Sequence, residues 1–165
     1  MATLALLALA GCGSGGGTDE TAPALRRVRG DGYSFDAPAT WRVVRRQRSL
    51  EARRPGGVEL VRVTVFPLAR PFRPALWSRA VAALDRSAAN LATQLGGRVH
   101  ERATVTVAAR RARRYVIRFE REGTDVAEEF TFLLDGRREY QLVCRREAER
   151  ELAACGRLTE SFRPA

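Results

Sequence analysis

The only histidine, His100, is the first residue to consider for general acid–base chemistry. A Ser/His/Asp or Cys/His site would need this imidazole to activate its nucleophile. His100 lies in an extended run, where alternation places it with Arg98 and Arg102 on the side opposite the apolar residues. The sequence has no GxSxG motif and no nucleophile next to the histidine. We therefore expect His100 to be a surface residue and not a catalytic one.

Carboxylates and amines are equally weak candidates for catalysis. Glu128 and Glu129 are adjacent on a predicted strand, so their side chains point to opposite faces and do not form an acid/base pair. All 29 basic residues are arginine, which excludes a P-loop lysine, a Schiff-base lysine and a lysine general base. One histidine without a local carboxylate cluster gives no metal-ligand set. The sequence predicts a protein without catalytic activity, bound metal or cofactor.

Cys12 follows an apolar segment at residues 2–10. This segment is far shorter than the roughly 20 residues that span a bilayer, but it fits the apolar region of a secretory signal. The tetrapeptide LAGC, which ends at Cys12, resembles the bacterial lipobox, in which lipid is attached to the cysteine thiol and the chain is cut just before it. We expect residues 1–11 to be a lipoprotein signal peptide and Cys12 to be lipidated. The alternative is an ordinary cysteine in a short apolar tail.

The residues after Cys12 predict a flexible tether. Positions 13–17 are glycine except for Ser14, and glycine forms helix and strand poorly. A tether over residues 12–29 would have a root-mean-square span of roughly 20 to 25 Å. The rest of the chain, residues 30–165, is long enough for one domain with a single core.

Cys144 and Cys155 remain as an even pair once Cys12 is assigned to lipid. Disulfides persist outside the cytoplasm, and this bridge would close a loop of about 12 residues and contribute about 3 kcal/mol. No CxxC or His/Cys spacing indicates zinc or thioredoxin-type redox chemistry. We predict a Cys144–Cys155 disulfide, with two buried reduced thiols as the alternative.

The formal net charge of +10 has two explanations. The use of arginine without lysine is typical of a GC-rich genome, and a basic surface also attracts anionic polymers and lipid headgroups. The densest basic cluster predicts Arg110, Arg114 and Arg118 on one face of a strand as a contact for an anionic surface. Tyr115 and Phe119 fall on the other, apolar face, so we predict no nucleic-acid platform.

The hydrophobic periodicity predicts the elements that position these residues. Alternation indicates strands, and apolar residues from Leu76 to Leu95 form one helical stripe. Asp135-Gly136 is a hairpin signal. Predicted strands are 32–38, 41–44, 49–53, 58–66, 98–107, 110–120, 126–134 and 138–144, and predicted helices are 74–95 and about 146–162. Such an order predicts an α+β fold, with an antiparallel sheet of about six to eight strands covered by a long central helix and a C-terminal helix.

The opening Gly32-Tyr33-Ser34-Phe35, with Pro38 and Trp41, resembles the start of PsbP-like domains. The long helix, the late strand pair and the closing Cys155 with Ser161-Phe162 are similar to small bacterial lipoproteins of the LpqN type. The resemblance spans residues 32–162 and rests on packing motifs. It implies a PsbP-like fold and a binding or accessory role, and it transfers no catalytic residue.

Together these features predict a lipid-anchored binding or accessory lipoprotein on the extracytoplasmic face of the cell membrane. Its expected partners are the membrane, through the anchor, and an envelope protein or anionic envelope polymer. The alternative is a carrier that holds a small apolar ligand in a cleft between helix and sheet.

Overall fold

The computed structural model describes residues 23–165. Cys12, the predicted signal peptide and the glycine-rich part of the predicted tether lie outside the described residues. The strands are β1 (Leu25–Gly30), β2 (Tyr33–Pro38), β3 (Arg42–Arg45), β4 (Ser49–Arg53), β5 (Leu60–Pro67), β6 (Arg98–Val107), β7 (Arg110–Arg121), β8 (Thr124–Asp135), β9 (Arg138–Glu147) and β10 (Arg163–Pro164). The helices are a short 3-10 turn η1 (Pro74–Leu76), α1 (Trp77–Gln94) and α2 (Ala153–Ser161).

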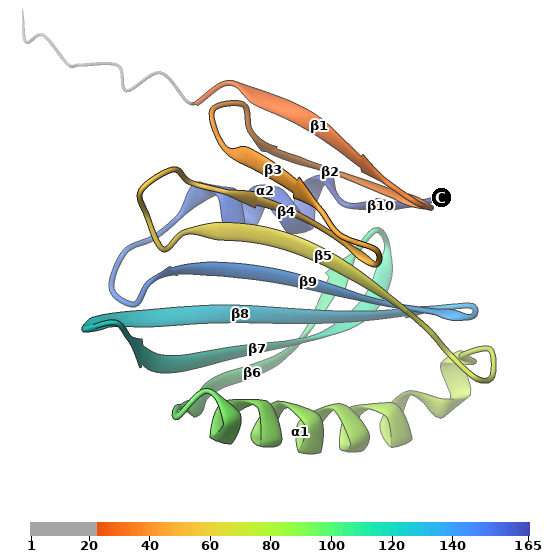
Figure 1. Ribbon diagram of the computed structural model, residues 1–165. Coiled ribbons are helices and arrows are strands. Elements are labelled where there is room, and N and C mark those ends of the chain that lie inside the picture. The colour runs from red at the N-terminus through yellow and green to blue at the C-terminus, as the bar shows by residue number, and fades with distance from the viewer. Residues whose placement is uncertain (1–22) are drawn as a thin grey trace, which may run out of the picture.

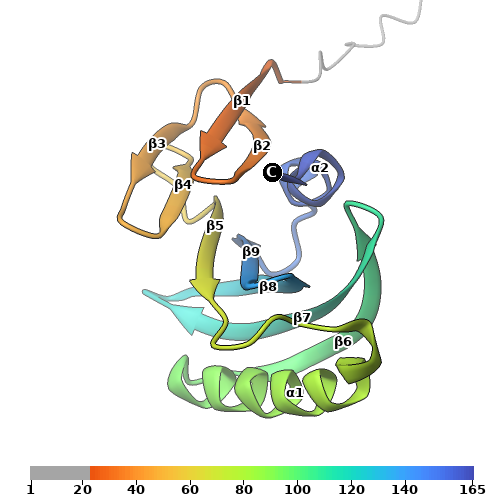
Figure 2. The same ribbon diagram turned by 90° about the vertical axis from the view of Figure 1, so that its right-hand side faces the viewer.

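The strands form two antiparallel sheets (Figure 1). The larger has seven strands in the order β3-β4-β5-β9-β8-β7-β6, and the smaller has three in the order β1-β2-β10. Helix α1 covers one face of the large sheet at β6 and β7, whereas α2 packs on the other side against β2 and β9 (Figure 2). This architecture confirms the predicted α+β fold with two covering helices; the separate three-stranded sheet was not predicted.

Both faces of the central strands are buried, which explains why their sequences are apolar on both sides. Facing α1, Leu84 and Ala88 pack with Ile117 of β7. Facing α2, the core joins Phe35 of the small sheet to Phe162, which follows α2. The helical stripe predicted for α1 is confirmed by its buried positions. Within residues 23–165, no helix has the length and apolar character needed to cross a membrane.

Strand β1 corrects the predicted end of the tether. The predicted tether includes residues 25–29, but these residues pair with β2. Val28 lies opposite Phe35 in the core. Val28 is a single buried apolar residue in a run of arginines, so the alternation typical of a strand is hidden in the sequence.

A β-bulge at His100 corrects the predicted faces of β6. Val99 pairs with Ile117 and Glu101 with Val116, which leaves His100 as the extra residue. The extra residue reverses the side-chain alternation, so Val99 packs toward α1 whereas Val105 packs toward α2. The predicted common face for these two valines is therefore wrong.

The β8–β9 turn lies one residue later than predicted. Asp135 pairs with Arg138, so the two turn residues are Gly136 and Arg137, with a positive φ of 54° at Gly136. This register sets Leu133 opposite Tyr140 on the α2 side. Moving a two-residue turn by one position changes each cross-strand partner by two residues and leaves the faces as they were.

The C-terminal helix is shorter than predicted. Residues 145–147 continue β9, where Glu147 still pairs with Val126, and α2 begins only at Ala153. The predicted start near residue 146 is wrong because the charged end of β9 is held by cross-strand pairing, with Arg145 opposite Glu128.

Candidate functional site

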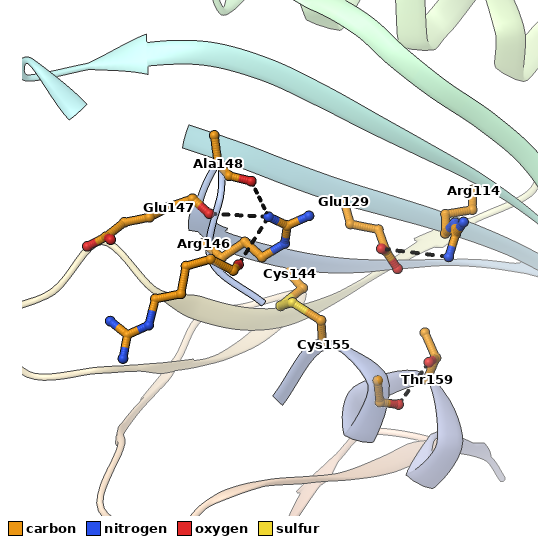
Figure 3. The surroundings of a disulfide bond; sticks show 10 residues. Arg114, Glu129, Cys144, Arg146, Glu147, Ala148, Cys155 and Thr159 are labelled. Carbon is orange, nitrogen blue, oxygen red and sulfur yellow. Dashed lines mark hydrogen bonds and ion pairs between the residues drawn. A yellow bond between two sulfur atoms is a disulfide. The ribbon is translucent and has the colours of Figure 1, made fainter. Parts of the chain in front are cut away.

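The predicted disulfide is present and joins Cys144 of β9 to Cys155 of α2, with 5.4 Å between their Cα atoms (Figure 3). Cys144 is buried in the core on the α2 side of the large sheet. The chain between them is held by Arg146, whose guanidinium donates hydrogen bonds to the carbonyls of Glu147 and Ala148. The bridge therefore fastens α2 to the central strand of the sheet, and the prediction is confirmed.

The arginines predicted to contact an anionic surface lie on one face of β7, as alternation requires, and each is next to a carboxylate. The partners are Asp135 for Arg110 (3.3 Å), Glu101 and Glu129 for Arg114 (4.0 Å to Glu129), and Glu149 for Arg118 (2.7 Å). Burial raises the pKa of Glu129, while the nearby Arg114 lowers it to a smaller extent. The geometry favours a structural role for these arginines, and their contact with an anionic surface stays a prediction.

The candidates for acid–base chemistry do not converge. His100 is exposed in the bulge, whereas Glu128 is 2% exposed and accepts a hydrogen bond from Arg145 at 2.8 Å. Glu129 lies on the other side of β8, near Arg114. Across residues 23–165, no group of three or more His, Cys, Asp or Glu side chains forms a potential metal site.

A cluster that the sequence reasoning missed joins α1 to β7. Asp85 of α1 accepts hydrogen bonds from the Tyr115 hydroxyl at 2.6 Å and from the Arg113 guanidinium at 3.1 and 3.2 Å. Burial, helped by Asp85, raises the pKa of Tyr115 to about 12. Burial also raises the pKa of Asp85, but the hydrogen bonds from Tyr115 and Arg113 outweigh it and hold that pKa below its usual range. The available signal was an aspartate beside Leu84 in the apolar stripe of the helix.

The geometry favours a structural role for this cluster. Tyr115 keeps its proton at neutral pH and uses it to bond Asp85, so it is not available as a base. Arg113 also lies over the Tyr115 ring, 5.5 Å from its centroid. Together the three side chains fix the position of α1 on the sheet.

A hollow of ≈ 320 Å³ is lined by residues from three hairpin turns. These turns lie toward the same end of the molecule (Figure 1). The turns join β1 to β2, β3 to β4 and β8 to β9. We call this hollow the basic hollow. It is lined by Gly30, Asp31, Tyr33, Arg45, Arg46, Gln47, Arg48, Ser49, Leu50, Val65, Pro67, Arg137 and Arg138.

Glycine at position 32 allows the first and third turns to approach each other. Gly32 has a φ of 74°, a conformation that glycine adopts without strain. A Cβ at this position would clash with the guanidinium of Arg138. The Tyr140 hydroxyl donates a hydrogen bond to the Gly32 carbonyl at 3.3 Å, which ties β9 to the turn between β1 and β2.

The charges around the basic hollow are not balanced. Five arginines contribute to its lining, against the single carboxylate of Asp31. In the part of the chain that the structure describes, none of the five has a carboxylate oxygen within 4.0 Å of its guanidinium nitrogens. Arg45 donates to the carbonyl of Arg29 at 3.0 Å, a neutral partner. The lining of the hollow therefore carries an excess of positive charge, which suits the binding of an anion.

Besides the charged residues and the polar Gln47 and Ser49, the lining has an apolar part. Leu50 is 1% exposed and Tyr33 6% exposed, and Val65 and Pro67 complete this surface. The Tyr33 hydroxyl donates to the carbonyl of Val63 at 3.2 Å, so its hydrogen bond is used within the fold. Burial raises the pKa of Tyr33, and its ring lies against the hollow as a neutral group.

Sequence reasoning missed the basic hollow because its parts are far apart in the chain. Arg45-Arg46-Gln47-Arg48 and Arg137-Arg138 are visible as basic runs at turns. The denser run on β7 drew the prediction instead. Only the strand order, with β5 and β9 adjacent, brings the β3–β4 and β8–β9 turns to the same end of the sheet.

The fold is shared with solved structures, although no protein-family model and no curated protein sequence matches the chain. LpqN from Mycobacterium tuberculosis, which is involved in cell envelope biogenesis, is 14% identical with a TM-score of 0.56. The similarity covers 84% of this chain and 89% of LpqN. It confirms the predicted LpqN-type fold, while the PsbP-like assignment stays a prediction.

Two other solved structures are less similar, because the match covers less of the other chain or the TM-score is lower. A protein from Bacteroides thetaiotaomicron is 10% identical with a TM-score of 0.56 over 81% of this chain, which spans only 45% of that protein's length. A Pseudomonas aeruginosa protein of unknown function is 16% identical with a TM-score of 0.48, over 75% of this chain and 83% of that one. At these identities the two structures with a TM-score of 0.56 show the fold alone.

Proposed function

We propose that the chain is a lipid-anchored accessory protein on the extracytoplasmic face of the cell membrane, without catalytic activity, that binds an anionic envelope component. The observation that carries the binding role is the ring of five arginines around the basic hollow, without carboxylate partners within 4.0 Å in residues 23–165. The lipobox-like LAGC sequence ending at Cys12 supports the anchor.

The compartment is supported by two independent features. The Cys144–Cys155 disulfide is of a kind that persists in oxidising compartments and is rare in the cytosol. LpqN, which shares the fold, is involved in envelope biogenesis. Both features favour a place in the cell envelope.

The chemistry of the basic hollow favours recognition over bond-making. Guanidinium groups stay protonated at physiological pH, so they bind anions without accepting protons. The only carboxylate in the lining, Asp31, is exposed. An anionic polymer or amphiphile of the envelope fits this lining, and its binding would weaken as salt increases.

The alternative of a carrier for a small apolar ligand has support at the basic hollow, not under α1. Leu84 and Ala88 of α1 are 7% and 1% exposed and pack directly on the sheet. The apolar surface formed by Val65 and Pro67 is the part that an apolar group could contact. Tyr115 and Phe119 are buried on the α1 side, which argues against base stacking on β7.

Anchoring is tested by replacing Cys12 with serine. The wild-type chain is expected in the membrane fraction with a lipidated residue 12 by mass spectrometry, and Cys12→Ser in the soluble fraction or unprocessed. Unchanged partitioning of Cys12→Ser would contradict the anchor.

Binding is tested with the full chain carrying Cys12→Ser and anionic phosphatidylglycerol vesicles, with phosphatidylcholine vesicles as reference. Sedimentation is expected only with anionic vesicles and is expected to decrease with salt. Arg46→Gln combined with Arg137→Gln is expected to reduce it. The matched control is Arg79→Gln with Arg86→Gln, two exposed arginines of α1 that lie outside the hollow. Equal losses for both pairs would show a general charge effect and contradict a defined site.

A further inference from the structure

We propose that the basic hollow binds a phosphate monoester that carries a short apolar chain. This inference rests on the proposed anion-binding function and names the class of ligand. It joins two properties of one lining: guanidinium groups without carboxylate partners and a buried apolar wall.

The charged part of the lining favours phosphate. Guanidinium groups present paired N–H donors that match phosphate and carboxylate oxygens. Five arginines against Asp31 leave four positive charges in excess, which favours a doubly charged phosphate monoester over a singly charged carboxylate. Two turns supply the arginines: Arg45, Arg46 and Arg48 come from one, and Arg137 and Arg138 from the other. A phosphate between these turns would meet donors from both.

The apolar part of the lining favours a chain attached to the phosphate. Leu50 and Tyr33 are nearly inaccessible to solvent, and both border the hollow. The Tyr33 hydroxyl already bonds to Val63, so this wall has no donor left for a sugar or an alcohol at that atom. Methylene groups laid on the half-buried Val65 and the exposed Pro67 would leave water at no cost in hydrogen bonds.

The volume limits the length of the chain. At ≈ 320 Å³, the hollow is at the lower end of the roughly 300–1,000 Å³ typical of ligand sites. It has room for a phosphate and a few carbons, and not for a lipid with two full acyl chains. The bound part is therefore a short ester or the first carbons of a longer single chain.

Two neighbouring hollows lack this combination. In a hollow of ≈ 520 Å³ beside β3, the lining Arg53 is paired with Glu51 at 2.8 Å. In a hollow of ≈ 230 Å³ near α1, the guanidinium of Arg111 lies 5.2 Å from the centroid of the Trp77 ring, and Arg110 pairs with Asp135. The basic hollow is the better site for an added anion.

The test is isothermal titration calorimetry of the full chain carrying Cys12→Ser, at constant ionic strength. The probes are inorganic phosphate, ethyl phosphate, hexyl phosphate, hexanoate and hexyltrimethylammonium. Hexyl phosphate is expected to bind about tenfold more tightly than ethyl phosphate, because four more methylenes are partly removed from water. Hexanoate should bind more weakly than hexyl phosphate, and the cation should not bind.

Variants locate the two parts of the ligand. Arg48→Gln with Arg138→Gln is expected to weaken hexyl phosphate binding at least tenfold, whereas the Arg79→Gln and Arg86→Gln pair leaves it unchanged. Val65→Thr keeps a similar shape but adds a hydroxyl to the apolar wall. It is expected to reduce the advantage of hexyl over ethyl phosphate and to leave ethyl phosphate binding intact.

The outcomes separate this inference from the proposed function. Equal affinity for inorganic, ethyl and hexyl phosphate would overturn the inference, because a free phosphate would then satisfy the site, while anion binding would stand. Binding of all hexyl compounds regardless of charge would also overturn it and favour the apolar carrier. If no phosphate binds, and vesicle binding is unchanged by Arg46→Gln with Arg137→Gln, both the inference and the proposed anion-binding function would be contradicted.

Discussion

The arginines of the long strands and those around the basic hollow have opposite surroundings. Arg145 of β9 bonds to the buried Glu128, and Arg113 of β7 bonds to Asp85 of α1. Around the basic hollow, Arg46, Arg48 and Arg137 line a cavity whose one carboxylate, Asp31, lies beyond ion-pair distance. The same residue type therefore stabilises the fold in one region and is left available for a ligand in the other.

The physical reason is the difference in solvation. A strand buried on both faces fixes each charged side chain opposite a defined neighbour, and an unpaired charge there would carry a large desolvation cost. A turn is exposed to water, so its charges remain unpaired at little cost. The paired arginines of the strands thus stabilise the fold, and the unpaired arginines around the basic hollow are those that we propose bind an anion.

The largest loss of stability is expected for Arg145→Met. The substitution leaves Glu128 buried without its 2.8 Å partner, with only Arg62 nearby at 3.7 Å. Loss of one member of a buried pair costs about 3–5 kcal/mol in the free energy of unfolding. Urea denaturation measures it, and Arg145→Met combined with Glu128→Leu should recover most of the loss. A loss of unfolding free energy below about 1 kcal/mol would contradict the structural role of the strand arginines.

A smaller loss of stability is expected for Asp85→Asn, which weakens the hydrogen bonds from Arg113 and Tyr115. Hydrogen bonds to charged groups contribute about 1.5–3 kcal/mol. Because the pKa of Asp85 is lowered in the folded state, its contribution is complete above the carboxyl's ordinary pKa. That contribution is lost as pH falls through the folded-state value.

Chemical denaturation at a series of pH values measures this dependence. The difference in stability between wild type and Asp85→Asn should shrink as the solution is acidified. Tyr115→Phe is the control that removes one donor and keeps the carboxylate. A difference that grows toward acid would contradict the lowered pKa.

Arg118→Gln is expected to cost only about 0.2–1 kcal/mol, although it also lies on a strand. Its partner Glu149 is 85% exposed, so solvent screens the ion pair. Thermal unfolding in low and high salt would measure the effect, which should nearly vanish in high salt. A salt-independent loss of several kcal/mol would show that exposed strand pairs resemble buried ones.

The smallest effect on stability is expected for Arg46→Gln with Arg137→Gln. Surface substitutions without a paired partner change the free energy of unfolding by about 0.5 kcal/mol or less. Calorimetric unfolding without ligand should therefore match wild type while anion binding decreases. A marked loss of stability would place these arginines with the structural set.

The sequence predicted what depends on local patterns. The stripe around Leu84 and Ala88 predicted α1, and strict alternation predicted the limits of β6 at Arg98 and Val107. Cysteine arithmetic predicted the disulfide, because two residues remained once Cys12 was set aside.

What the sequence did not reveal depends on single residues or on long-range order. One extra residue at His100 reversed the faces of β6, and one residue of turn register moved the pairing of Tyr140. The basic hollow needs Asp31, Arg46 and Arg137 at one end of the molecule, which follows only from the order of the strands. Local charge density favoured β7, where the arginines are already paired.

The construction of the basic hollow from turns has an evolutionary consequence. Residues 31, 46–48 and 137 project from the ends of strands whose buried side chains hold the fold. Substitutions at these tips leave the hydrophobic layers intact, so the preferred ligand is free to diverge among proteins that keep the same scaffold. Proteins of this shape are therefore expected to differ first in their hairpin tips.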